Sequence, residues 1–504
     1  MGISVEAGLL AFVLVGIFYA AQENIGLQLS DEGFLWIGVL RTVDGQIPMR
    51  DFKSYDPGRY YWSAAFVPIF GSGILGIRRS IAVLQFLGLW FAIDVLRSQV
   101  DNLLILSLIG ILLLLWMQPR HKRYDHIISL LAVLFASLLI GSPDTTMFFA
   151  AGVFIGIAAL FGANHGAYNF CAFSLIILVM LLHLEIESPA LKLSIWLTGI
   201  AVGYSPMLAM WLFMSGMFQK YWNDRVLRIL KESKGNITLP IPWPWRFARR
   251  NLPPIYKTAN ILGGIHFVVL PIFYLLGIIY TSFVVSINIA PMVAASCFVG
   301  IFYLHHAFSR ADISHLSQSI IPFVTGTISV ILWVDSNLFI IITLIFLVIS
   351  AAATTVYLTP LAQLILSKSK YVRFEIRKDI LLLSSGEKYL LENIKCFVNL
   401  NLLESDDIFI APYEPGLYPV LGRKPRLPDD CLLIHENDSN QNLIINGLKE
   451  KSVKWVLIKN SALDGREDLR FCNTHRLVWQ FVQNAYEAVE CPNIGAERQF
   501  YRRR

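Results

Sequence analysis

Long apolar runs alternate with short polar segments over residues 1–366. A membrane-spanning helix needs about 20 apolar residues. Runs that approach this length cover residues 5–22, 60–77, 80–97, 102–117, 127–141, 146–162, 168–184, 192–214, 261–284, 288–305, 319–335 and 338–366. The pattern therefore predicts a mostly α-helical, polytopic membrane domain over residues 1–366 with about 12–13 spans, whose first external loop covers residues 23–59.

The pattern changes after residue 366, where residues 367–504 have the composition of a soluble domain. Residues 408–410 and 455–458 are short apolar runs followed by turn-forming residues, which is typical of buried strands. Residues 441–451 and 473–488 have the pattern of helices. A small C-terminal α/β domain is predicted.

Composition supports the membrane assignment. The 504 residues are 55% hydrophobic and 15% charged, with a net charge of +6, whereas soluble proteins are about 25% charged. The basic residues cluster in short loops, which suits anionic lipid headgroups and argues against a nucleic-acid partner. Six cysteines form no CxxC pair, which argues against a zinc site.

Two basic segments suggest an orientation. Arg78-Arg79 and residues 120–123 are predicted to be cytoplasmic anchors if the N-terminus is cytoplasmic, so that loop 23–59 lies on the opposite side of the membrane. A site for a lipid-linked phosphate is the alternative for the second segment. An even number of spans would return residues 367–504 to the cytoplasm, so the side of this domain stays open at this point.

The first loop concentrates carboxylates, among them Asp31, Glu32, Asp51 and Asp56. Acidic groups at a membrane face are costly to desolvate and usually serve a function. Cation binding, proton relay and general-base catalysis all suit them. Residues 32–43 are predicted to form a surface helix that places Asp31 at its N-terminus, where a carboxylate can also act simply as a cap.

Aromatic rings accompany these acids, since Tyr55, Tyr60, Tyr61 and Trp62 follow closely. Rings can stack on the apolar face of a sugar while carboxylates accept hydrogen bonds from its hydroxyl groups. The loop therefore favours a sugar ligand.

A second cluster lies in residues 305–315, between two apolar runs, and contains three histidines. Arg310 could bind a phosphate with its planar fork. Asp312 and His315 are three residues apart and would share the face of a helix. The alternatives are a solvated turn with a snorkelling arginine, or a metal ion held by the histidines.

At these residues the chain resembles the C-type membrane glycosyltransferases, in a bacterial branch. The resemblance is carried by Asp31-Glu32 after the first span, by residues 44–52 (DGQIPMRDF) and 55–60 (YDPGRY), and by the segments 164–168 (NHGAY) and 310–315 (RADISH). Residues 406–412, 415–418 and 422–425 are similar to segments of the extracytoplasmic domains of such enzymes.

The resemblance implies an inverting hexosyl- or pentosyltransferase in the bacterial inner membrane. It would use a polyprenyl-phosphate-linked sugar donor and a glycan, lipid or protein acceptor, and residues 367–504 would be extracytoplasmic. Asp31 would be the catalytic base. The substrate-binding residues would be Glu32, Asp51, Tyr55, Arg59, Arg310, Asp312 and His315. Some family members need a divalent cation and others do not, so the metal requirement stays open.

Two other classes of function remain as alternatives. A transporter or flippase of lipid-linked sugars would place its ionisable groups inside the spans, whereas most acids here lie at span ends. A non-enzymatic scaffold would leave the acidic and aromatic first loop unexplained. The sequence therefore favours the glycosyltransferase.

Overall fold

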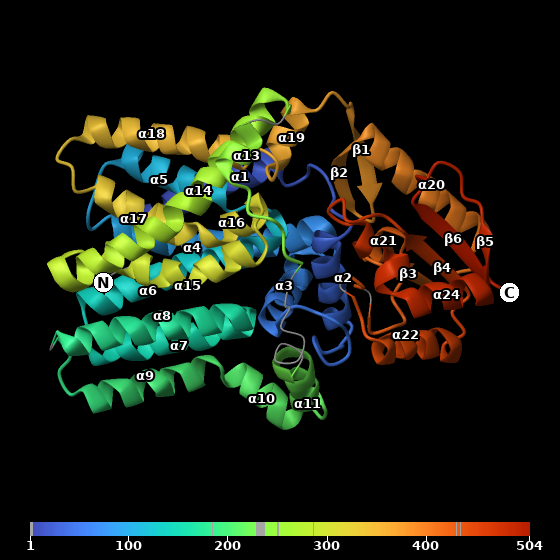
Figure 1. Cartoon of the computed structure of the whole chain (residues 1–504), viewed down its shortest axis with the longest axis horizontal. Coiled ribbons are helices and arrows are strands. Elements are labelled where there is room, and N and C mark those ends of the chain that lie inside the picture. The colour runs from blue at the N-terminus through green and yellow to red at the C-terminus, as the bar shows by residue number, and fades with distance from the viewer. Residues whose placement is uncertain are drawn as a thin grey trace. The chain divides into compact units, whose positions relative to one another are not determined.

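The computed structural model describes residues 4–183, 185–227, 237–248, 251–285, 287–429, 431–433 and 435–504. Its contacts divide the chain into two units (Figure 1). Residues 1–23 and 78–365 form the first, which we call the bundle unit. Residues 24–77 and 366–504 form the second, which we call the C-terminal unit. The first loop thus belongs with the tail. The boundaries of 1–366 and 367–504 rest on composition and stay a prediction.

Helices make up the bundle unit. They are α1 (Val5–Gln22), α4 (Ile74–Leu96, whose first turn belongs to the other unit), α5 (Leu103–Trp116), α6 (Arg123–Gly141), α7 (Thr145–Phe161), α8 (Ala163–Leu182), α9 (Pro189–Gly203), α10 (Ser205–Phe213), α11 (Met217–Tyr221), α13 (Pro244–Ala248), α14 (Pro254–Ile279), α15 (Pro291–Ser309), α16 (Ile313–Ser319), α17 (Ile321–Ile331), α18 (Asn337–Thr354) and α19 (Pro360–Leu366).

The predicted fold class is confirmed, and the protein is a multi-pass membrane protein. Among the described residues, seven helices are long and apolar enough to cross a membrane, or eight if α9 and α10, bent by 55°, form one span. The predicted count of about 12–13 is higher because several apolar runs are short helices. Three of them, α5, α7 and α17, have 14, 17 and 11 residues, and residues 57–70 form a helix assigned to the C-terminal unit.

Small residues set the closest packing in the bundle unit. Gly152 and Gly156 of α7 face Gly199 and Gly203 of α9, and a Cβ atom at any of these positions would overlap the backbone of the partner helix. This spacing of four is the small-residue pattern that lets membrane helices approach closely. Elsewhere large side chains fill the core, as where the rings of Phe135 and Phe154 stack at 4.9 Å.

The two basic segments lie at the end of the bundle unit where α1 finishes. Arg78 donates a hydrogen bond to the carbonyl of Glu23, and Arg120 donates to the carbonyl of Gln22 at 3.2 Å. Arg123 pairs with the Glu23 carboxylate at 2.6 Å, with both side chains buried. The two segments therefore contact residues 22 and 23, where the predicted first loop begins, and the side of the membrane on which they lie stays a prediction. They bind the carbonyls that a helix C-terminus leaves unpaired.

The chain also leaves the bundle unit for its tail at this Glu23 end. Ser317 of α16 donates a hydrogen bond to the carbonyl of Gln118, beside the start of α6. Ile313 of α16 packs against α14, and Tyr256 in the first turn of α14 stacks on Tyr357, just beyond α18, at 4.5 Å. Residues 24–77 and 366–504 belong to one unit, and the side of the membrane on which this unit lies stays a prediction.

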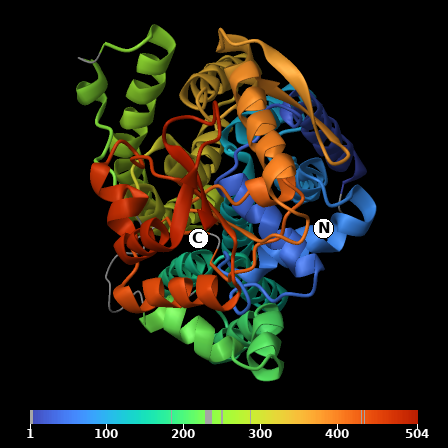
Figure 2. The same ribbon diagram turned by 90° about the vertical axis from the view of Figure 1, so that its right-hand side faces the viewer.

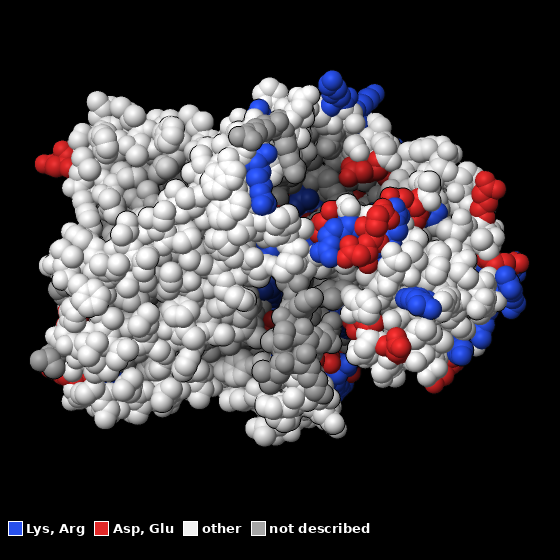
Figure 3. Space-filling view, in the orientation of Figure 1, with Lys and Arg blue, Asp and Glu red and all other residues white. Residues whose placement is uncertain are grey.

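The C-terminal unit mixes helices and strands, as predicted (Figure 2). Its elements are α2 (Asp31–Val43), α3 (Pro57–Phe70), β1 (Tyr371–Ile376), β2 (Asp379–Ser384), α20 (Ser385–Asn401), β3 (Ile408–Ala411), α21 (Leu417–Val420), α22 (Asp438–Glu450), β4 (Trp455–Lys459), α23 (Phe471–Thr474), α24 (Arg476–Ala485), β5 (Tyr486–Val489) and β6 (Arg498–Arg503). Figure 3 shows charged side chains of both signs over this unit and few over the bundle helices.

Two sheets organise the tail. Strands β1 and β2 form an antiparallel hairpin, and the larger sheet has the order β3-β4-β6-β5. Strands β3 and β4 are parallel, with Ile408 opposite Trp455, while the other neighbours are antiparallel. The buried side chains of Phe409 and Val456 share a core with Leu448 of α22. The two strands predicted from apolar runs are therefore adjacent in the sheet.

Residues of the first loop are built into the tail. Backbone hydrogen bonds of 2.8 Å join Gly26 to Leu382 and Leu382 to Asn24, which aligns the loop with β2. Farther along, Lys53 pairs with Glu436 at 3.1 Å. Backbone pairing of this kind satisfies groups that would otherwise need water, so the loop is part of a folded unit and not a free connection.

Candidate active site

Asp31 is the first residue of α2, and Ser30 holds the cap position before it. The carboxylate of Asp31 does not therefore serve as the helix cap. It accepts a hydrogen bond from Gln28 Nε2 at 3.3 Å and another from the hydroxyl of Tyr413 at 2.5 Å. The side chain is half-buried. A carboxylate at the first turn of a helix is stabilised in its ionised form by the helix dipole.

Tyr413 comes from the tail, 382 residues after Asp31. Burial raises the pKa of Tyr413 well above its usual range, and the neighbouring Tyr55 hydroxyl and Asp31 carboxylate add to this effect. Tyr413 therefore keeps its proton through the physiological range and acts as a donor. Sequence reasoning missed this residue. The only signal was its position between residues 406–412 and 415–418, which carry the family resemblance in the tail.

A close backbone approach holds Tyr413 beside Asp31. The amide of Gly416 donates to the carbonyl of Leu29 at 2.9 Å. A Cβ atom at Gly33, in the first turn of α2, would overlap the backbone of Gly416. The two glycines thus let the tail segment contact the start of α2 directly, and this contact brings the Tyr413 hydroxyl to the carboxylate.

Tyr55 and Arg59 join the same group. The Tyr55 ring meets Phe34 of α2 edge to face at 5.1 Å, and the guanidinium of Arg59 lies over the Tyr55 ring at 5.1 Å. Burial raises the pKa of Tyr55 well above its usual range, and the charge of Asp31 is the next cause. The structure therefore brings together three predicted site residues, Asp31, Tyr55 and Arg59, and adds Tyr413.

Glu32 and Asp51 are engaged in local structure. Glu32 is buried, and its carboxylate accepts a hydrogen bond from the backbone amide of Gln28 at 3.3 Å. Asp51 accepts from Arg50 at 2.7 Å and from the amide of Ile47 at 2.8 Å. The pKa of Asp51 is lowered, and the hydrogen bond from Arg50 is the largest cause, whereas burial acts in the opposite direction. Asp51 therefore closes the turn over residues 47–51.

The second predicted group lies in the bundle unit, where Asp312 is its centre. Its carboxylate accepts from Arg310 Nε at 3.0 Å and lies 2.9 Å from His315 Nδ1. It also caps α16 by accepting the His315 amide at 2.8 Å. Burial opposes the ionisation of Asp312, but the bonds to His315 and the charge of Arg310 outweigh it and lower the pKa. The predicted Asp312–His315 pair is thus present.

A chain of buried and half-buried polar rings continues from this group. The His315 ring lies 5.4 Å from the His306 ring, which lies 6.4 Å from the His165 ring. His165 in turn contacts Asp125 at 2.5 Å and the Tyr303 hydroxyl at 2.8 Å. In the sequence Asp125 follows the basic segment 120–123, and His165 lies in the segment 164–168 that carries the family resemblance. They meet only because the helices α6, α8 and α15 pack together.

A metal centre finds no support in the described part of the chain. No group of three or more His, Cys, Asp or Glu side chains there could hold a metal ion. Among the three histidines of the second cluster, His305 contacts the Tyr168 hydroxyl at 2.7 Å, whereas His306 and His315 face each other.

Comparison with solved structures identifies the fold. ArnT from Cupriavidus metallidurans bound to undecaprenyl phosphate matches with a TM-score of 0.54 and 12% identity, covering 99% of this chain and 97% of that chain. The apo form of the same protein matches with a TM-score of 0.53 and 12% identity, covering 99% of this chain and 97% of that chain. The apo oligosaccharyltransferase from Archaeoglobus fulgidus gives 0.49 and 12%, covering 96% of this chain and 72% of that chain.

No family model matches the sequence, and no curated protein matches it. The structural match extends over nearly the whole chain, so the fold is that of the C-type membrane glycosyltransferases. The fold predicted from the family resemblance is thereby confirmed.

Proposed function

We propose that the protein is an inverting membrane glycosyltransferase. It moves a sugar from a polyprenyl-phosphate donor to an acceptor hydroxyl at the extracytoplasmic face of the bacterial inner membrane. The observation that supports this most is the half-buried Asp31 carboxylate, held by Tyr413 and flanked by Tyr55 and Arg59, in a fold shared with ArnT. ArnT has been solved with undecaprenyl phosphate bound, and such a lipid is the proposed carrier here.

The reaction follows from the charges. The Asp31 carboxylate accepts the proton of the acceptor hydroxyl, and the freed oxygen attacks the anomeric carbon of the donor sugar. The bond from that carbon to the phosphate oxygen breaks, so polyprenyl phosphate leaves with the electron pair and the anomeric configuration inverts. A positioned general base contributes about 10²–10⁴-fold. Arg59 and Arg310 are the candidates for offsetting the charge that develops on the phosphate.

The other predicted residues are assigned supporting parts. The Tyr55 ring, beside Asp31, would stack on the apolar face of the donor sugar. Glu32, Asp51, Asp312 and His315 are proposed to bind substrate. Among them Asp312 and His315 stand beside Arg310, so these two would orient the guanidinium that receives the phosphate.

Replacing Asp31 by Asn tests the proposal. The amide keeps the size of the side chain but cannot accept the proton, so release of polyprenyl phosphate from the donor should fall by about 100-fold or more. Asp44→Asn is the matched control, because Asp44 lies in the same loop and pairs with Lys424 at the surface. Activity of Asp31→Asn equal to the wild type, with both variants folded, would reject Asp31 as the base.

Transport of a lipid-linked sugar is the second candidate, and the buried Asp125–His165 pair, which continues to the half-buried His306, favours it. Ionisable groups inside membrane spans often relay protons in transporters. The two functions separate in one assay on proteoliposomes. The assay uses a fluorescently labelled lipid-linked sugar. If the protein is a transporter, the wild type and Asp31→Asn should move this lipid across the bilayer equally well, and the wild type should release no polyprenyl phosphate.

A further inference from the structure

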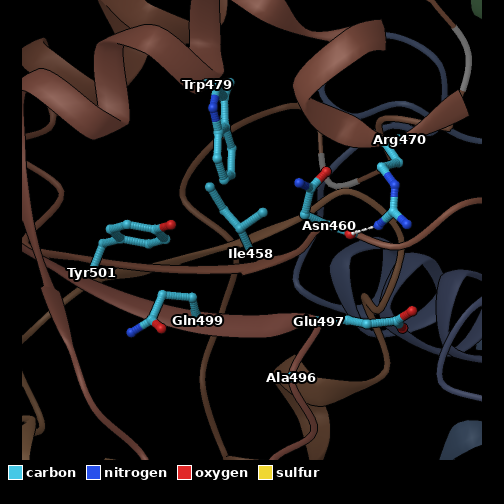
Figure 4. A pocket seen from close by; sticks show the side chains of 8 residues that line it. All are labelled: Ile458, Asn460, Arg470, Trp479, Ala496, Glu497, Gln499 and Tyr501. Atoms are coloured by element: carbon cyan, nitrogen blue, oxygen red, sulfur yellow. Dashed lines mark hydrogen bonds between the residues drawn. The ribbon is translucent and has the colours of Figure 1, made fainter. Parts of the chain in front are cut away.

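A pocket of about 440 Å³ lies in the tail, beside strands β4 and β6 (Figure 4). Ile458 comes from β4, Gln499 and Tyr501 come from β6, and Trp479 comes from α24. Strand β4 is parallel to β3, and its carboxyl end leads to Asn460. Ile458 pairs with Gln499 across β4 and β6, and Tyr501 is two residues farther along β6, so these three side chains lie on one face of the sheet, the face that α24 covers.

One part of the pocket is an apolar corner. The rings of Trp479 and Tyr501 lie 6.4 Å apart and meet at 83°, and Figure 4 shows Ile458 beneath Trp479. The Tyr501 hydroxyl accepts a hydrogen bond from Gln483 at 3.0 Å, which fixes its ring. Trp479 is half-buried, so part of its indole remains open to a ligand. Such a corner accepts a rigid ring with apolar C–H faces.

The lining also offers polar groups, with Gln499 next to Tyr501 and Asn460 on the other side of the pocket (Figure 4). Asn460 uses its Oδ1 to accept the amide of Cys472 at 3.2 Å, and this leaves its amide NH₂ as a donor. Gln499 uses its NH₂ to donate to the carbonyls of Val489 and Phe500, and this leaves its side-chain oxygen as an acceptor. A donor and an acceptor beside an apolar corner complement hydroxyl groups on the edge of a pyranose ring.

The charges distinguish between classes of sugar. The guanidinium of Arg470 donates to the carbonyl of Asn460 at 2.6 Å and to the Glu467 carboxylate at 2.9 Å. The exposed Glu497 carboxylate forms no ion pair within the described part of the chain. Arg470 and Glu497, the two charged residues of the lining, have opposite signs, so the pocket has no surplus of either charge. Arg470 is held by Glu467, so the lining offers no favourable partner for a phosphate or carboxylate group, whereas the exposed Glu497 carboxylate can accept hydrogen bonds from hydroxyl or amino groups.

We propose that this pocket is a saccharide-binding site for uncharged or amino-bearing glycans. Binding itself does not depend on the glycosyltransferase activity. The role that we assign to it, docking the acceptor glycan, rests on the proposed function. In that role the pocket selects an acceptor by its sugar rings and offers no favourable partner for the phosphate of the carrier-linked donor.

The test uses the full-length protein in detergent micelles on an array of neutral, amino-bearing, carboxylated and phosphorylated glycans. Neutral or amino-bearing glycans should be retained. Titration calorimetry of the strongest one should show affinity at least about tenfold weaker in Trp479→Ala, the loss typical of a central aromatic contact. Tyr389→Ala, at an exposed aromatic position on α20, should bind as the wild type does.

Further variants keep the test independent of folding. Ala496→Leu adds bulk at an exposed position in the pocket lining and should weaken binding as Trp479→Ala does. Glu497→Gln should weaken amino-bearing glycans more than neutral ones. No retained glycan, a preference for acidic glycans, or unchanged affinity in both Trp479→Ala and Ala496→Leu would overturn the proposal.

The same proteins separate this inference from the proposed function. Asp31→Asn should lose transfer and keep glycan affinity. In an active wild type, Trp479→Ala should raise the KM for the acceptor about tenfold and leave kcat unchanged. If the wild type binds glycans but releases no polyprenyl phosphate, the saccharide-binding pocket is supported and the proposed glycosyltransferase activity is rejected.

Discussion

Replacing Tyr413 by Phe removes only the hydroxyl group, which donates a hydrogen bond to the candidate base Asp31. The hydroxyl donates to Asp31 Oδ1 at 2.5 Å, within the range for a bond from a hydroxyl to a carboxylate. Hydrogen bonds to charged groups contribute about 1.5–3 kcal/mol. Both side chains are half-buried, so we expect the lower value of about 1.5 kcal/mol. The Phe ring keeps the packing of the Tyr ring.

The expected result is a shift in the dependence of rate on pH. The bond favours the ionised form of Asp31, so its loss makes protonation of this carboxylate easier. At 1.36 kcal/mol for each pH unit, the acid limb of the kcat/KM profile should move to higher pH by about one unit. The raised pKa of Tyr413 keeps it protonated in the wild type, so ionisation of this tyrosine does not complicate the acid limb.

The assay measures release of polyprenyl phosphate from the donor between about pH 4 and 8, where carboxylates and histidines titrate. Tyr389→Phe removes a hydroxyl from an exposed tyrosine of the same unit and serves as the control. If the acid limbs of Tyr413→Phe and the wild type coincide while both proteins are active, Tyr413 does not contact the catalytic base, and the positioning role is refuted.

Three further predictions concern the architecture. Gly33→Ala should lower the free energy of unfolding by about 1–3 kcal/mol, because its Cβ would overlap the backbone of Gly416. The control Gly386→Ala places its Cβ in open space and should leave the free energy of unfolding unchanged. Equal thermal stability of the two variants would reject the contact between Gly33 and Gly416. Glu23→Gln should cost about 3–5 kcal/mol, because it leaves the buried Arg123 charge uncompensated, whereas Glu6→Gln, at an exposed pair, should change stability by less than about 1 kcal/mol. Cysteines introduced at positions 44 and 389 of a cysteine-free chain should react with an impermeant reagent from the same side of the membrane; labelling from opposite sides would contradict the shared unit.

Local patterns predicted the local structure well. The helix predicted over residues 32–43 is α2, Asp31–Val43, and the strands predicted over residues 408–410 and 455–458 are β3 and β4. Apolar periodicity determines such elements because each buries one continuous stretch of sequence. The Asp312–His315 pair was also predictable, since both residues lie within one helical turn.

The contacts that define the candidate site were not predictable in this way. Tyr413 reaches Asp31, and Asp125 reaches His165, only through packing of distant segments. Composition also missed the structural role of the basic segments. An arginine that binds the carbonyls at the end of a helix, as Arg120 does, has the same sequence signature as a cytoplasmic anchor. The difference lies in burial, which a single sequence does not reveal.

The grouping of loop and tail changes how the proposed enzyme would work. The base comes from the loop, its hydrogen-bond donor comes from the tail, and the saccharide pocket lies in the same tail. Acceptor recognition and proton removal therefore belong to one folded unit. A chain shortened to residue 366 would lose Tyr413 and expose the surface of α2 that Gly416 covers. Its inactivity would follow from a disturbed base as much as from a lost acceptor site, so Tyr413→Phe and Trp479→Ala separate the two causes where truncation does not.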